Sequence, residues 1–141
     1  MLLGVSPWQL SPVTHVNLDL NNVLIVEDEV LIALDLVDVV CSAGGHAVGP
    51  AVSVRQAHEH LNENLVTAAI LDVNLGNEDS LDVARRLRCA GIPFIYHSGH
   101  FDQGDRSWPL APLARKPADA RTLIAALERA ASATKCAKVP S

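Results

Sequence analysis

Four short apolar segments, each followed by a polar residue, place the strongest constraint on how this chain can fold. They are Val23–Val26 before Glu27 and Asp28, Ala68–Leu71 before Asp72, Ile92–Tyr96 shortly before Ser98, and Leu113–Arg115 before Lys116. Strands of a parallel sheet are buried on both faces, so they read as continuous apolar runs. Ligands of such open sheets bind at the carboxyl ends of the strands. We therefore expect three acids, a hydroxyl and an ammonium to meet at one edge of a sheet.

Helical patterns separate these strands. They extend from Glu27 to Gly44, from Ser53 to about Asn64, from Ser80 to Gly91 and from Asp119 to Ala133. A weaker strand over 46–52 contains Gly49 and Pro50, which suits an edge position. Strand and helix alternate five times, and crossovers of this kind are right-handed. The pattern predicts an α/β fold, a doubly wound five-stranded parallel sheet with helices on both faces.

Two segments carry more specific expectations. In the first helix, the acids at 27–29 suit the positive end of the helix dipole. Its apolar stripe is read as Val30, Leu34, Val37 and Cys41, widened by Ala33, Leu36 and Val40. Between Gly99 and Pro112, the glycine and prolines disfavour a long helix, so the region of the fourth helix is expected to be shortened.

Composition limits the domain organisation and the class of protein. The 141 residues suit one domain, and an apolar fraction of 49% supplies a core. We expect an irregular leader over 1–21, the domain over 22–134 and a tail over 135–141. A net charge of −5 disfavours nucleic acid as a partner, and no apolar run is long enough to cross a membrane. The three cysteines form no pair motif, and Cys41 and Cys89, both in helical stretches, are expected to be buried. Unpaired cysteines and the lack of a signal peptide indicate a cytoplasmic protein.

The acidic residues point to a divalent cation. Glu27, Asp28 and Asp72 would repel one another, because two unit charges at ~4 Å cost about 4 kcal/mol at an effective dielectric near 20. Such a cluster needs a cation or raised pKa values. Ligands that are all oxygen favour Mg²⁺. Either Glu27 or Asp28 alone would be explained equally well as a helix cap, so the magnesium interpretation depends on Asp72.

The same residues suit phosphoryl transfer, which needs positioning and charge stabilisation more than covalent chemistry. Asp72 would be the nucleophile that forms an aspartyl phosphate. Lys116 supplies a compact positive charge and Ser98 a hydroxyl for the phosphoryl oxygens. His97 and His100 flank Ser98, but no third ligand stands near them to complete a zinc site.

The stretch 23–133 resembles the receiver domain of two-component response regulators. The resemblance lies in the order of the acidic pair, the lone Asp72, Ser98 and the Lys116-Pro117 dipeptide. The segments 71–76 and 93–99 more closely resemble a group of stand-alone receivers common in alphaproteobacteria. The resemblance implies a flavodoxin-like sheet with strand order 2-1-3-4-5. It also implies a histidine kinase or a histidine phosphotransfer protein as phosphodonor.

The resemblance assigns roles residue by residue. Asp72 would accept the phosphoryl group, with Lys116 and Ser98 binding it. Asp28, Asp72 and the backbone carbonyl of Asn74 would ligate Mg²⁺ or Mn²⁺, with Glu27 acting mainly through a bound water. Further expectations concern a cis bond between Lys116 and Pro117, and control of water access to the phosphoryl group by His100 and the side chain of Asn74.

The expected function is therefore a single-domain response regulator that switches a protein-binding surface, and not an enzyme beyond its own phosphorylation and dephosphorylation. The surface implied by the resemblance is formed by the fourth helix, fifth strand and fifth helix. It would bind an unidentified downstream protein, or a second copy of the chain. Leu113 stands where many receivers place an aromatic, which keeps open a degenerate, phosphorylation-independent binding module. An aspartyl-phosphate hydrolase is disfavoured because Asn74 stands where such enzymes have a second acid.

Overall fold

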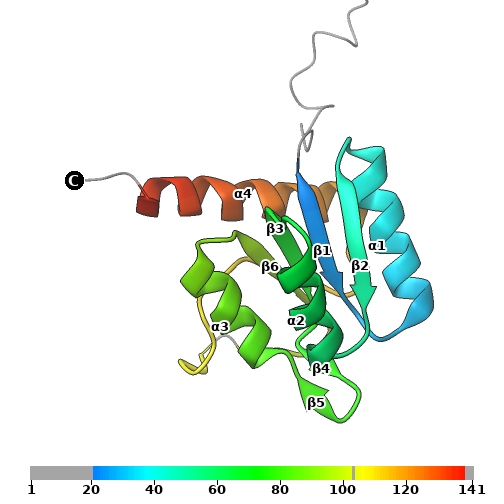
Figure 1. The fold of residues 1–141 in the computed structure, drawn as a ribbon, viewed down its shortest axis with the longest axis horizontal. Coiled ribbons are helices and arrows are strands. Elements are labelled where there is room, and N and C mark those ends of the chain that lie inside the picture. The colour runs from blue at the N-terminus through cyan, green and yellow to red at the C-terminus, as the bar shows by residue number, and fades with distance from the viewer. Residues whose placement is uncertain (1–20, 103, 139–141) are drawn as a thin grey trace, which may run out of the picture.

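The computed structural model describes residues 21–102 and 104–138, with side chains described up to residue 134. Five parallel strands form the central sheet in the order β2-β1-β3-β6-β7, which confirms the predicted α/β class and strand order (Figure 1). The strands are β1 (Asn22–Val26), β2 (His46–Ala51), β3 (Ala68–Leu71), β6 (Phe94–Ser98) and β7 (Leu113–Arg115). The weaker strand β2 lies at the edge, as its Gly49 and Pro50 predicted. A small antiparallel hairpin, β4 (Asn74–Leu75) and β5 (Glu78–Asp79), follows β3.

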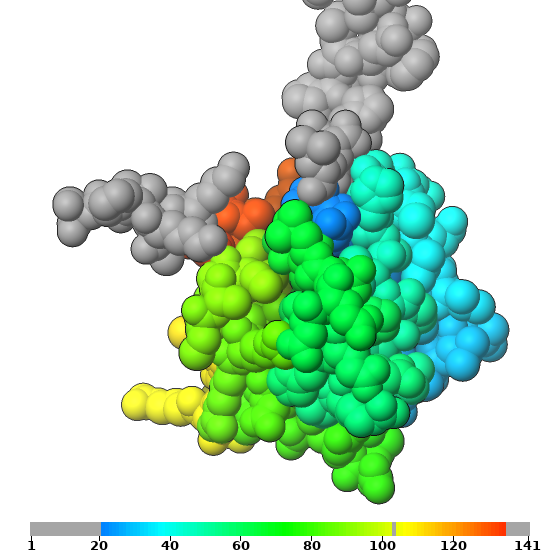
Figure 2. All heavy atoms as spheres, viewed as in Figure 1, coloured from blue at the N-terminus to red at the C-terminus, as the bar shows by residue number. Residues whose placement is uncertain are grey.

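Helices cover both faces of the sheet, because its central strands β1, β3 and β6 are buried on both sides. The described residues form α1 (Val30–Ser42), α2 (Val54–Glu63), α3 (Leu81–Ala90) and α4 (Ala120–Lys138). Residues of α1 and α4 pack with Val23 and Ile25 of β1 in one buried cluster. Residues of α2 and α3 pack with Leu24 and Val26 in a second cluster on the opposite face. In Figure 2, α2 and α3 form most of the near side of the molecule, above the β4–β5 hairpin.

The first helix differs from its prediction in two ways. It begins at Val30, with Glu29 at the N-cap position, so the three acids lie before the helix and not in its first turn. Its buried residues are Ala33, Leu36 and Val40, the three that the prediction used to widen the apolar stripe. The stripe expected at Val30, Leu34 and Cys41 is instead exposed. Apart from Asp35 and Asp38, most positions of this helix are apolar, so periodicity alone did not select the face that meets the sheet.

Two smaller expectations also changed. Cys89, like Cys41, is exposed, because its helix α3 buries Val83, Ala84 and Leu87. The last helix continues to Lys138, past the predicted end at Ala133, and so takes in the first residues of the predicted tail. Its Ala-rich sequence favours such an extension. The predicted leader lies outside the described residues except for Asn21, and none of the described helices is long and apolar enough to cross a membrane.

No helix forms between β6 and β7 in the residues that the structure describes there. This agrees with the shortened fourth helix region expected from the sequence. Instead, Phe101 and Trp108 pack against the buried face of β6 that carries Phe94 and Tyr96. The Tyr96 hydroxyl donates a hydrogen bond to the Pro109 carbonyl oxygen at 2.6 Å. This irregular segment therefore covers the sheet in place of a helix.

Candidate functional site

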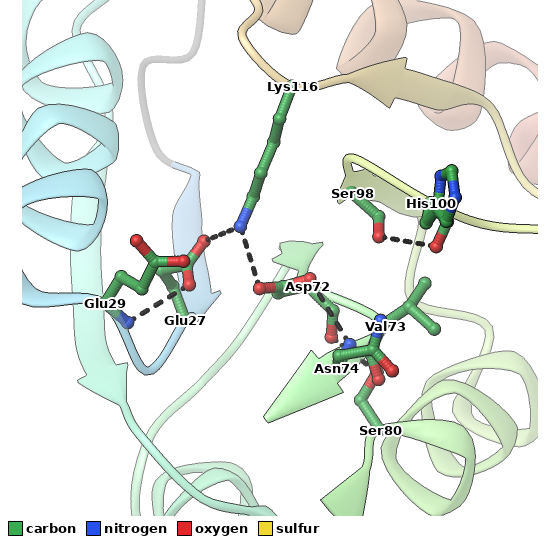
Figure 3. Close-up of polar contacts among 9 residues, drawn as sticks. All are labelled: Glu27, Glu29, Asp72, Val73, Asn74, Ser80, Ser98, His100 and Lys116. Carbon is green, nitrogen blue, oxygen red and sulfur yellow. Dashed lines mark hydrogen bonds and ion pairs between the residues drawn. The ribbon is translucent and has the colours of Figure 1, made fainter. Parts of the chain in front are cut away.

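The carboxyl ends of four parallel strands bring the predicted residues together. Glu27 follows β1, Asp72 follows β3, Ser98 ends β6 and Lys116 follows β7. Lys116 Nζ lies 2.7 Å from Glu27 Oε1 and 2.8 Å from Asp72 Oδ2, so one ammonium joins two carboxylates (Figure 3). The Lys116–Pro117 peptide bond is cis. Residues far apart in the sequence thus form one polar cluster at the sheet edge.

The acids form a group suited to a metal ion. Glu27, Asp28 and Asp72 each offer a carboxylate oxygen, and these oxygens lie within 4.8 Å of one another. Among the side chains described, those of residues 21–102 and 104–134, no other group of three or more His, Cys, Asp or Glu has this arrangement. Hard oxygen ligands of this kind fit Mg²⁺, and the group contains no thiolate or imidazole that would favour zinc. The donor set therefore fits the acidic metal site of a receiver.

Burial has the largest effect on the pKa values of Glu27 and Lys116. The Glu27 side chain is fully buried, and this burial raises its pKa to about 7, against the opposing effect of Lys116. Burial works against the charge of Lys116 as well, but its hydrogen bonds to Asp72 and Glu27 raise its pKa overall. Lys116 therefore stays protonated, whereas Glu27 gains a proton as the pH falls through neutrality.

This raised pKa gives the pH dependence a definite sign. The folded chain binds a proton on Glu27 that the unfolded chain, with a pKa of 4.5, has released. Stability should therefore fall as the pH rises between about 4.5 and about 7, by at most about 3 kcal/mol. Urea unfolding over this range should show the slope in wild type and a flatter profile in Glu27→Gln. A wild-type slope retained in Glu27→Gln would contradict the assignment, and Mg²⁺ should stabilise the wild type more at the alkaline end.

The backbone around Asp72 is held by neighbouring groups. The Asp72 N–H donates to the Val26 carbonyl oxygen at 2.9 Å, and the Ser80 hydroxyl donates to the Asp72 carbonyl oxygen at 2.7 Å. The Asn74 N–H donates to Asp72 Oδ1 at 3.3 Å, and the exposed Asn74 begins β4 two residues after Asp72. Ser80 occupies the N-cap position of α3, but its hydroxyl makes no capping hydrogen bond. It anchors the loop after β3 that begins with Asp72, a role for which the sequence carried no signal.

Ser98 and the two histidines occupy different environments. The buried Ser98 hydroxyl donates to the His100 carbonyl oxygen at 3.1 Å, while the His100 ring is exposed (Figure 3). His97 is buried, neither ring nitrogen has a hydrogen-bond partner, and burial lowers its pKa. Neither histidine belongs to the metal-suited group. A zinc site is thus not supported by the described residues.

Comparison with sequences gives partial matches. No family model matches the chain. The virulence transcriptional regulatory protein PhoP of Salmonella typhimurium is 40% identical over 70 residues, which is 50% of this chain and 31% of PhoP. The match thus spans about a third of the length of these curated relatives.

Comparison with solved structures extends the likeness to most of the domain. The response regulator PhyR from Brucella abortus is 26% identical with a TM-score of 0.74, covering 84% of this chain and 50% of that one. The receiver (REC) domain of the Erythrobacter litoralis response regulator PhyR is 27% identical with a TM-score of 0.73, covering 86% and 95%. Together with the strand order and the acidic cluster, these likenesses identify the chain as a response-regulator receiver domain of two-component signalling.

Proposed function

We propose that the chain accepts a phosphoryl group on Asp72 from a phosphohistidine donor and thereby switches a protein-binding surface. The observation that carries this proposal is the convergence of Glu27, Asp28 and Asp72 with Lys116 at one sheet edge. A carboxylate oxygen of Asp72 would attack phosphorus, the N–P bond of the donor would break, and the imidazole would leave with a proton. The product is an aspartyl phosphate, the covalent species that carboxylate nucleophiles form in phosphoryl transfer.

The metal would be held by the carboxylates of Asp28 and Asp72 and by the carbonyl of Asn74, with Glu27 contributing through a bound water. When bound, Mg²⁺ or Mn²⁺ supplies positive charge that offsets the carboxylates and the incoming phosphoryl oxygens. The oxygen atoms of Glu27, Asp28 and Asp72 already lie close enough to share one ion. Burying the charge of Glu27 is costly, as its raised pKa indicates, and the neighbouring Asp72 raises that pKa further by a smaller amount.

Lys116 and Ser98 would bind the transferred group. The Lys116 ammonium now pairs with Asp72 and Glu27, so it needs only a small displacement to pair with a phosphoryl oxygen on Asp72. The Ser98 hydroxyl would donate to another phosphoryl oxygen. The exposed side chains of Asn74 and His100 would limit the approach of water to the acyl phosphate and so set its lifetime.

We take the receiver domain to extend from residue 22 to the end of α4, with a histidine kinase or a histidine phosphotransfer protein as its donor. The donor must reach the acidic cluster, and α1 begins two residues after Asp28 with an exposed apolar patch, Val30, Leu31 and Leu34. Their exposed fractions of 64%, 84% and 56% leave this patch open to a partner protein. It is the surface we assign to the phosphodonor.

The output surface needs one correction. The resemblance implied a surface that includes a fourth helix, but the described residues between β6 and β7 form no helix. The corresponding face of this chain consists of the irregular segment after β6, together with β7 and α4. A downstream protein, or a second copy of the chain, would bind this face.

Labelling with acetyl phosphate tests the proposal without knowledge of the kinase. Incubation with radiolabelled acetyl phosphate and Mg²⁺ should give a label on the protein that hydroxylamine removes, because an acyl phosphate is the expected product. Chelation of the metal with EDTA should suppress it. Absence of label with Mg²⁺ present, under conditions that label a known receiver in parallel, would reject phosphorylation and leave the phosphorylation-independent binding module as the better interpretation.

A further inference from the structure

We infer that Ser98 and His100 couple phosphorylation to an aromatic cluster formed by Tyr96, Phe101 and Trp108, an inference that rests on the proposed function. This cluster would respond to phosphorylation in place of the aromatic residue that many receivers have on β7. The residue on β7 is Leu113, which pairs in register with Tyr96 and has no ring to change position. Any structural response of this region to phosphorylation must therefore use other side chains. The aromatic cluster lies on the strand that carries Ser98 and on the segment that follows it.

The first step is a competition for one proton. The Ser98 hydroxyl has a single hydrogen to donate, and it now donates this to the His100 carbonyl oxygen at 3.1 Å (Figure 3). A phosphoryl group on Asp72 would be a charged acceptor, and charged acceptors form stronger hydrogen bonds than neutral carbonyls. The hydroxyl would then donate to the phosphoryl oxygen, and the His100 carbonyl would lose its partner. Because His100 is exposed, water can take the place of that partner.

The second step is a movement at the beginning of the segment between β6 and β7, because different contacts hold its beginning and its end. Its later part is fixed independently of Ser98, because the Tyr96 hydroxyl binds the Pro109 carbonyl at 2.6 Å and Arg88 binds the Leu110 carbonyl. Its beginning is held by the Ser98–His100 hydrogen bond and by the Phe101 ring. Release of His100 should therefore affect Phe101 first.

The third step carries the change to Trp108. The Phe101 ring centroid lies 4.6 Å from that of Tyr96 and 5.2 Å from that of Trp108. Trp108 in turn contacts Tyr96 edge to face at 5.8 Å. Phe101 is only partly buried, so its displacement from the cluster costs less than that of a fully buried ring. Loss of one neutral hydrogen bond would shift the population of the released state by about fivefold.

Trp108 fluorescence provides a direct test. The sequence contains two tryptophans, so a Trp8→Phe background leaves Trp108 as the sole reporter. Beryllofluoride with Mg²⁺, used as a phosphoryl mimic, should increase the quenching of Trp108 by acrylamide. In Ser98→Ala the tether is absent in both states, so quenching should be high at the start and insensitive to beryllofluoride. A wild-type response retained in Ser98→Ala would overturn the coupling.

A second variant leaves Ser98 intact. Phe101→Leu weakens the aromatic contacts that hold the unphosphorylated arrangement, and linkage requires that such weakening favour the other state. Its affinity for beryllofluoride should rise by up to about fivefold, whereas Arg106→Ala, an exposed change in the same segment, should leave it unaltered. Unchanged affinity in Phe101→Leu would reject the inference.

The labelling experiment distinguishes a failure of the coupling from a failure of the phosphoacceptor function. If Asp72 is phosphorylated but Trp108 quenching does not change, the coupling is wrong and the phosphoacceptor function stands. If the protein takes no label at all, the proposed function fails and the coupling fails with it.

Discussion

Asp72→Asn is expected to abolish phosphoryl labelling of the chain. The amide keeps the shape of the side chain and can still accept a hydrogen bond from Lys116, which now lies 2.8 Å from Asp72 Oδ2. It lacks the negative charge and the nucleophilic oxygen needed to form an acyl phosphate. The label should fall by about 100-fold or more, because no other described carboxylate lies beside Lys116 except the fully buried Glu27.

A matched control distinguishes this effect from a general change of charge. Asp82 is an exposed acid on α3, outside the acidic cluster, so Asp82→Asn removes the same charge and should label as the wild type does. Full labelling of Asp72→Asn, or equal losses in both variants, would show that the phosphoacceptor has been misassigned. Mass spectrometry of the labelled wild type should place the modification in the peptide that contains Asp72.

Lys116→Met is expected to destabilise the folded chain by about 2–3 kcal/mol at a pH above 7. The substitution keeps the apolar stem of the side chain but leaves Glu27 and Asp72 without the ammonium that joins them. Removing one partner of a buried ion pair is costly because an uncompensated charge remains. The cost should shrink as the pH falls, since Glu27 can take up a proton and become neutral.

A double-mutant cycle identifies the buried charge as the cause. Glu27→Gln combined with Lys116→Met removes both the charge and its partner, and should recover most of the stability lost in Lys116→Met. Mg²⁺ should also stabilise Lys116→Met, because the remaining carboxylates can bind it. Urea unfolding of the four proteins measures these differences. Equal destabilisation of the single and double variants would indicate that Lys116 acts through packing and not through its charge.

Much of the fold could be predicted because parallel strands leave a strong pattern. Runs such as Val23–Val26 and Ala68–Leu71 are apolar on both faces, and polar residues follow them at once. That pattern implies the sheet and the edge at which Asp72 lies. The edge position of β2 followed equally from Gly49 and Pro50.

Other features of the site depend on contacts that no local pattern encodes. Ser80 resembles any helix cap, and only the path of the chain after β3 shows that its hydroxyl binds the Asp72 carbonyl. The Lys116–Glu27 ion pair joins the ends of β7 and β1, which are not neighbours in the sheet. The cover that Phe101 and Trp108 form over Tyr96 likewise has no periodicity from which it could be predicted.

The amino-acid sequence was sufficient to determine the class of fold and the chemistry at the strand ends, because burial on two faces and the placement of polar residues are local properties. The face of α1 that meets the sheet was decided only in three dimensions, since Val30 and Leu34 are as apolar as the residues that are buried in their place. The hydrogen bond between Ser98 and the His100 carbonyl was decided there too. Such choices depend on which surfaces are free once the sheet has formed, and that is a property of the whole packed chain.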